Sequence, residues 1–172
     1  HDDLISERLA TSFELFDVTS GVLVVSVRTL LQNMPPNRFV RSQSFLFEPG
    51  QTFDIQLERE RLTQTGYRHV ELVLERGEFA VRGSIMDIFP MGSGRPIRID
   101  LYDDLIDGIR SFDPDSQRTI ARLDEVRLLP AKEFPLDQSA ISRFRKAWHD
   151  TFNVDVRRCQ LYQDVSDGVA AQ

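Results

Sequence analysis

The strongest constraint on the fold of this chain is the stretch RGEFAVRGSIMDIFPMGSGRPIRIDLYDDLIDGIRSFD, which covers residues 76–113. Apolar and polar residues alternate in it, most regularly in Ile97–Tyr102, and short runs of Gly, Pro and Asp interrupt the alternation. A period of two is typical of a strand with one buried face, because successive side chains point to opposite sides. Such short interruptions favour antiparallel connections, since parallel strands need longer crossovers. The stretch therefore predicts an antiparallel meander.

Turn signals divide the surrounding region into elements. The predicted strands are Tyr67–Leu74, Glu78–Phe89, Ile97–Tyr102, Leu105–Phe112 and a last one near Glu125–Leu129. Their connections are predicted at Pro90–Gly94, Asp103-Asp104 and Asp113–Ser116. A helix is expected before the strands, over Asp54–Thr65, with Gly66 placed to end it. These elements predict a β-rich region over residues 45–129.

The first part of the chain, residues 1–44, has a different pattern. Asp2 and Asp3 could cap a helix, whose apolar face would carry Ile5, Leu9, Phe13 and Phe16. The continuous apolar run Val22–Val27 predicts a strand covered on both faces, as in parallel α/β sheets. A short helix over Thr29–Asn33 would end at Pro35-Pro36. The segment is therefore expected to form part of an α/β layer.

The last part of the chain, residues 130–172, predicts one helix. Asp137 is placed to cap it, and its apolar side would carry Ile141, Phe144, Trp148 and Phe152. From Asn153 onward the pattern is weak, and a poorly ordered tail is expected.

Charge and composition limit the classes of function. The net charge is −6, and residues 45–129 hold 11 Arg against 16 Asp and Glu, which disfavours a DNA-binding module that neutralises phosphates. The single cysteine, Cys159, cannot form an internal disulfide, and this fits a reducing cytoplasm. No apolar run approaches the length of a membrane span. A cytoplasmic protein with no membrane partner is expected.

Motifs for catalysis, cofactors and metals are weak or missing in the sequence. There is no G-x-x-x-x-G-K loop, and Gly92-Ser93-Gly94 lacks the third glycine of a dinucleotide motif. The three histidines are scattered, and a calcium loop starting at Asp113 would place Arg118 where a tight turn needs glycine. We therefore expect no catalytic residues, no cofactor and no metal.

Three residues of the predicted meander form a candidate partner-binding face. In Ile97–Tyr102 the alternation puts Arg98 and Tyr102 on the outward side, and Arg82 is outward in its own strand. If the strands pair across the Pro90–Gly94 loop, Arg82 falls beside Tyr102, with a bulge at Gly83 able to shift the register by one. Arg and aromatic residues are enriched at interface hot spots. From the pattern alone an ordinary solvated face is the favoured interpretation, because charged outward residues are normal on half-exposed sheets.

A resemblance to a known family favours the partner-binding interpretation over the solvated face. The stretches TGYRHVELVLERGEFAVRGSIMDIFPMGS, FDPDSQRTI, LLPAKEFPLD and HDDLISERLATSFELF resemble the N-terminal region of the bacterial transcription-repair coupling factor (Mfd) family. The resemblance covers nearly the whole chain and weakens after Asp155. That region of the family is similar to the excision repair protein UvrB, and RGEFAVRGSIMDIFP falls in the module that the two share.

The resemblance implies a partner and a set of contact residues. In the family this module binds UvrA, the damage-recognition ATPase, and Arg82, Arg98 and Tyr102 match the positions used for that contact. The third position is often Phe in the family, so Tyr102 is a departure that keeps the ring and adds a hydroxyl. The family contacts RNA polymerase and DNA through other parts of the full-length protein, an ATP-dependent translocase.

These inferences together predict a mixed α+β chain in which an antiparallel β-rich domain is inserted between partial α/β, Rossmann-like segments. The predicted domains are 1–44, the end of a UvrB-like domain; 45–129, the UvrA-binding domain; and 130–172, the helical start of a further domain. The predicted function is a non-enzymatic interaction module that binds UvrA and recruits nucleotide excision repair to stalled RNA polymerase. The alternative is a fragment of UvrB, the DNA-loading subunit of the excision nuclease.

Overall fold

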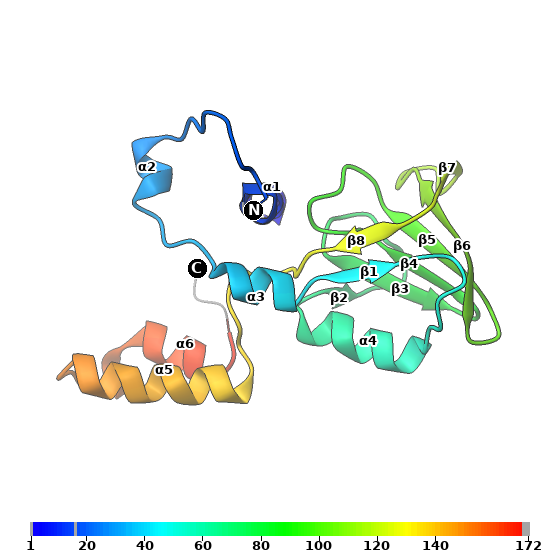
Figure 1. Cartoon of the computed structure of the whole chain (residues 1–172). Coiled ribbons are helices and arrows are strands. Elements are labelled where there is room, and N and C mark those ends of the chain that lie inside the picture. The colour runs from blue at the N-terminus through cyan, green and yellow to red at the C-terminus, as the bar shows by residue number, and fades with distance from the viewer. Residues whose placement is uncertain (1, 16, 170–172) are drawn as a thin grey trace. The chain divides into compact units, whose positions relative to one another are not determined.

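The computed structural model describes residues 2–15 and 17–169. It divides into two compact units, His1–Glu133 and Phe134–Gln172. Over the described residues the chain is a mixed α+β protein, with one six-stranded sheet and one two-stranded sheet. Figure 1 shows the helices and strands with their labels. The predicted fold class, with an antiparallel β-rich region at its centre, is confirmed at this level.

The six-stranded sheet has the strand order β2-β3-β4-β5-β6-β7. Its strands are β2 (Arg68–His69), β3 (Glu78–Arg82), β4 (Ile85–Ile88), β5 (Ile97–Tyr102), β6 (Leu105–Phe112) and β7 (Thr119–Leu123). Neighbours from β3 to β7 are antiparallel, as predicted. The predicted strands that correspond to β5 and β6 are confirmed to the residue, whereas β7 is not among the predicted strands.

The segment Glu78–Phe89, predicted as one strand, is a hairpin. β3 ends at Arg82, which is paired with Ile85 at the start of β4, and Gly83 and Ser84 form the turn. Gly83 has a φ of +60°, a conformation that two-residue hairpin turns require and that glycine adopts easily. The prediction was wrong because apolar residues continue on both sides of the turn and hide it. As a result, β4 lies between β3 and β5.

The segment Tyr67–Leu74, also predicted as a strand, is mostly irregular. Only β2 is a strand there, and it runs parallel to β3 rather than antiparallel. The small second sheet pairs β1 (Phe45–Phe47) with β8 (Val126–Leu128), and Phe45 lies opposite Leu128. The last predicted strand, near Glu125–Leu129, is therefore confirmed as β8, and β1 is a strand that the pattern did not indicate.

The apolar core lies against one side of the six-stranded sheet, which we call the inner face. Its members on the central strands are almost fully buried: Phe79, Met86, Ile88, Ile97, Ile99 and Ile109. Helix α4 (Ile55–Gln64) adds Leu62 to this core. The Asp54 carboxylate caps α4 by accepting hydrogen bonds from the backbone N–H groups of Gln56 (2.8 Å) and Leu57 (3.1 Å). The predicted helix is confirmed, and the opposite side of the sheet, the outer face, is turned away from this core.

Helix α1 (Asp2–Leu15) confirms the first predicted helix. Leu9 is fully buried in the core, with Ile5 and Phe13 packed at its edge, while Phe16 lies outside the described residues. The Ser6 hydroxyl accepts a hydrogen bond from the Gly92 N–H at 2.7 Å. This contact ties α1 to the loop between β4 and β5.

The predicted strand Val22–Val27 is not formed. Residues 22–26 have no regular structure, Val27 begins the short helix α2 (Val27–Leu30), and Val22 and Val24 are 92% and 88% exposed. The physical reason is that a strand depends on a neighbouring strand for its backbone hydrogen bonds, and no described strand pairs with this run. A further short helix, α3 (Asn37–Ser42), follows Pro35-Pro36 and was not predicted.

The second unit is helical. Helix α5 (Gln138–Thr151) begins after Asp137, whose carboxylate accepts a hydrogen bond from the Ala140 N–H at 2.9 Å, as predicted. The segment after Asn153, for which no ordered element was expected, forms a 3-10 turn, η1 (Val156–Arg158), and helix α6 (Gln160–Ser166). The Tyr162 ring packs at 5.7 Å from the Trp148 ring, which holds α6 against α5. The pattern failed here because α6 is short, and none of its residues is fully buried, so it has no clear apolar face.

Candidate functional site

Charged side chains form a row across the outer face of the six-stranded sheet. Asp87 on β4 is paired with Arg98 on β5, Arg98 with Arg110 on β6, and Arg110 with Arg122 on β7. Directly paired residues of antiparallel strands point to the same side of the sheet. The same face also carries, by strand alternation and register, Arg82, Asp100 and Tyr102. These seven side chains are four arginines, two carboxylates and one aromatic ring.

The three predicted contact residues lie on this face, but not with the predicted neighbours. Arg82 is paired with Ile85 and Tyr102 with Leu105, so the expected pairing of Arg82 with Tyr102 was wrong. The reason is the hairpin described above, which inserts β4 between their strands. Pairing across the Pro90–Gly94 loop does occur, between β4 and β5, one residue away from the expected register.

Asp87 brings two of the predicted residues together. Its side chain is 1% exposed, and its two carboxylate oxygens accept hydrogen bonds from Arg98 Nε at 2.7 Å and Arg98 Nη2 at 2.9 Å. Arg82 Nη2 donates to the same carboxylate. The hydrogen bonds to Asp87 raise the pKa of the Arg98 guanidinium above its usual range, although partial burial acts in the opposite direction. One buried carboxylate therefore orients two guanidinium groups.

Arg98 is further held by apolar and amide groups. Its guanidinium lies over the Phe112 ring, 4.8 Å from the ring centroid. Phe112 belongs to a small apolar cluster on the outer face with Val73, Ala80 and Phe89. Arg98 Nη2 lies 3.5 Å from Gln117 Oε1, and the Gln117 amide nitrogen donates a hydrogen bond to the Val73 carbonyl at 3.3 Å. Arg98 is consequently the most enclosed of the three predicted residues, with 17% of its side chain exposed.

Tyr102 is the most exposed of the three predicted residues. It ends β5, just before the two-residue turn at Asp103-Asp104, and it is 72% exposed. Its cross-strand partner Leu105 is also exposed. Together they present apolar area at the end of the charged row, where a partner could cover it.

A second ion pair lies beside the first. Arg110 Nη2 contacts both carboxylate oxygens of Asp100, at 2.7 Å and 2.6 Å. Asp87, Asp100, Arg110 and Arg122 are not among the predicted site residues. Alternation in Ile97–Tyr102 could have identified Asp100 as a neighbour of Arg98, but the other three depend on strand pairing, which the sequence pattern did not give correctly.

The chemistry that the row offers depends on how its charged groups are paired. Asp87 and Asp100 are both engaged by arginines, so neither is free to act as a general base. Among residues 2–15 and 17–169, no three His, Cys, Asp or Glu side chains are grouped as in a metal site. What the arrangement provides is fixed hydrogen-bond donors for acidic groups beside an exposed ring.

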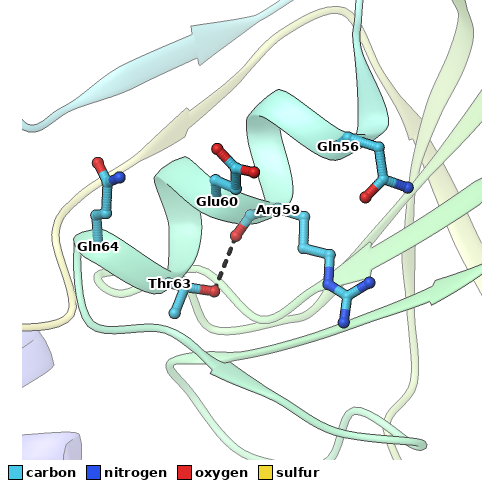
Figure 2. A pocket seen from close by; sticks show the side chains of 5 residues that line it. All are labelled: Gln56, Arg59, Glu60, Thr63 and Gln64. Carbon is cyan, nitrogen blue, oxygen red and sulfur yellow. Dashed lines mark hydrogen bonds between the residues drawn. The ribbon is translucent and has the colours of Figure 1, made fainter.

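A shallow depression elsewhere on the first unit is lined by one helix alone. Figure 2 shows the five side chains involved, all from the exposed side of α4: Gln56, Arg59, Glu60, Thr63 and Gln64. The Thr63 hydroxyl donates to the Arg59 carbonyl at 2.9 Å, as is common within helices. A surface formed by a single solvated helix encloses no ligand.

In the described part of the chain no helix is both long and apolar enough to cross a membrane.

The β-rich region of this fold matches a known protein family. The family model described as the UvrB interaction domain matches residues 45–134, which include both sheets. The chain therefore belongs to the UvrB interaction domain family.

The chain is also similar to curated transcription-repair-coupling factors. The chain is 46% identical over 168 residues to the transcription-repair-coupling factor of Escherichia coli K12, and 42% identical over 170 residues to that of Haemophilus influenzae Rd, in each case over 98% of this chain. It is 34% identical over 131 residues, 76% of this chain, to that of Bacillus subtilis 168. It spans 15% or less of the length of these relatives. The resemblance to the coupling-factor family is thus confirmed, and the alternative of a UvrB fragment is not favoured.

Proposed function

We propose that this chain is the UvrA-binding module of a transcription-repair coupling factor, and that it recruits nucleotide excision repair to stalled RNA polymerase. The observation that carries the proposal is the match of residues 45–134 to the UvrB interaction domain, within a chain 46% identical to a coupling factor. The module acts by binding alone, in the cytoplasm. Contacts with RNA polymerase and DNA belong to the remaining length of a coupling factor.

The proposed contacts are Arg82, Arg98 and Tyr102 on the outer face. Arg98 is fixed by Asp87 and the Phe112 ring, so it loses little side-chain freedom when a partner binds. Arg82 shares Asp87 but has about half of its side chain exposed, which leaves donors for an acidic group of UvrA. Tyr102 supplies ring area that a partner can bury. The sheet thus presents anchored cations next to an exposed aromatic residue.

The proposed domain limits are 1–44, 45–129 and 130–172. They are supported by the family match, which begins at residue 45, and by the pairing of β1 with β8 at the two ends of the central region. The division into units after Glu133 falls near the second limit.

The proposal is tested by titrating purified bacterial UvrA with the 172-residue chain in a calorimeter. The wild-type chain is expected to bind, and Arg82→Ala, which leaves the Asp87–Arg98 pair intact, is expected to weaken binding about tenfold, or ~1.4 kcal/mol. Simultaneous reversal of charge at Arg82 and Arg98 should abolish it.

The matched control is Arg59→Ala, because Arg59 is an exposed arginine on α4, away from the outer face. This variant should bind UvrA as the wild type does. Absence of binding by the folded wild-type chain would refute the proposed function. Equal binding by all variants would keep UvrA as the partner and remove the outer face from the contact.

A further inference from the structure

The arginine row on the outer face is unequally neutralised. Arg98 and Arg82 share the Asp87 carboxylate, and Arg110 is paired with Asp100. Arg122, which is paired across the strands with Arg110, is exposed and has no carboxylate within 4.0 Å among the described residues. Like charges placed directly opposite each other in a sheet repel. The row therefore ends, at its β7 side, in a guanidinium that no carboxylate of residues 2–15 and 17–169 neutralises.

A glycine on the neighbouring strand sets the position of the Arg122 side chain. A Cβ atom added to Gly108 on β6 would lie 3.5 Å from Arg122 Nη2. The backbone of Gly108 is buried. The guanidinium of Arg122 thus lies across the bare backbone of β6 instead of extending from the sheet edge. Gly108 is itself paired with Asp100, two residues before Tyr102 on β5. The Arg122 guanidinium is consequently directed toward the part of the outer face that carries Tyr102.

We propose that Arg122 is a further partner-binding residue and that its guanidinium receives a carboxylate of UvrA. The proposal rests on the proposed function, and it extends the contact from β3 and β5 across β6 to β7. Neighbouring strands are about 4.8 Å apart, so the row from Arg98 to Arg122 spans roughly 10 Å. The complementary surface would present acidic groups at that spacing.

An acidic protein surface fits this face better than nucleic acid does. The two carboxylates that lie between the arginines, Asp87 and Asp100, would repel a continuous phosphate backbone, whereas individual carboxylates of a protein can be placed to avoid them. Charge complementarity therefore selects an acidic patch on the proposed partner.

The test measures the rate and equilibrium of UvrA binding by Arg122→Ala, Arg122→Glu and Gly108→Val. Arg122→Ala should weaken binding about threefold to fivefold, the range for one solvent-facing ion pair, mainly through slower association that is less sensitive to salt. Arg122→Glu should weaken it about tenfold or more. Gly108→Val keeps the charge but displaces the guanidinium, and it should reproduce the loss seen with Arg122→Ala.

Arg59→Ala is again the matched control, and thermal unfolding of each variant confirms the fold. If the wild type and Arg59→Ala bind UvrA, and Arg122→Ala and Arg122→Glu bind equally well, the inference is overturned while the proposed function stands. If Arg122→Ala weakens only binding to a DNA duplex, or only self-association in sedimentation, the occupant is not UvrA and the inference is likewise overturned. If the wild type does not bind UvrA, the proposed function fails first and this inference fails with it.

Discussion

The two sides of β5 share one backbone but differ in what they leave to solvent. On the inner side, Ile97, Ile99 and Leu101 are all buried in the core. On the outer side, exposure rises along the strand, from Arg98, held by Asp87 and Phe112, to Tyr102, whose ring is largely free. These inner side chains of β5 leave no surface for a partner, because folding has already covered them. On the outer face, Arg98 is held by contacts within the chain, whereas Tyr102 is exposed to solvent. We therefore expect substitutions near Arg98 to affect folding stability and substitutions at Tyr102 to affect partner binding.

The largest expected effect comes from the inner face. Ile99→Ala should lower the free energy of unfolding by about 3 kcal/mol, because it leaves a cavity at a fully buried position. Urea unfolding measures the loss. The control is Ile120→Ala on β7, where the isoleucine is exposed and the change should stay within about 0.5 kcal/mol. Equal losses from both variants would break the distinction between the two faces.

An intermediate effect is expected at Asp87, where stability and recognition meet. Asp87→Asn should lower the free energy of unfolding by about 2 kcal/mol, because it leaves two guanidinium groups without their shared carboxylate. It should also weaken UvrA binding, since Arg82 and Arg98 lose their orientation. Urea unfolding and calorimetry measure the two effects, with Asp104→Asn in the exposed turn as the control. A lower free energy of unfolding with unchanged UvrA affinity would show that Asp87 contributes to stability alone.

The smallest effect on folding is expected at Tyr102. Tyr102→Ala should change the free energy of unfolding by less than about 0.5 kcal/mol, because the ring is mostly in solvent already. It should nevertheless weaken UvrA binding by about 2 kcal/mol, as loss of an aromatic hot spot does. Tyr102→Phe keeps the ring and should bind almost as the wild type does. A large loss of stability, or unchanged affinity for UvrA with Tyr102→Ala, would contradict the separation described above.

The sequence predicted elements whose evidence is local. β5 and β6 were found to the residue because each has a clear pattern and they share a turn at Asp103-Asp104. The existence of α4 and α5, though not their bounds, followed from their capping aspartates. The hairpin at Gly83 was missed because a two-residue turn leaves too little polar sequence to mark it. The run Val22–Val27 has the composition of a buried strand, but composition cannot supply the neighbouring strand that it needs.

The candidate site was predicted in part for the same reason. Arg98 and Tyr102 share one strand, so their common face followed from alternation alone. The contribution of Asp87, and the continuation of the row through Arg110 to Arg122, arise from pairing between strands. Register is a property of two segments, and one segment's pattern does not determine it.

The pairing of β1 with β8 has a consequence for engineering this region. Because Phe45 lies opposite Leu128, the chain enters and leaves the β-rich region at adjacent points. A short Gly-Ser bridge could therefore replace residues 45–129 without pulling apart the segments on either side. For the same reason, the region could be transplanted into a loop of an unrelated carrier, where it would display the arginine row on a new scaffold.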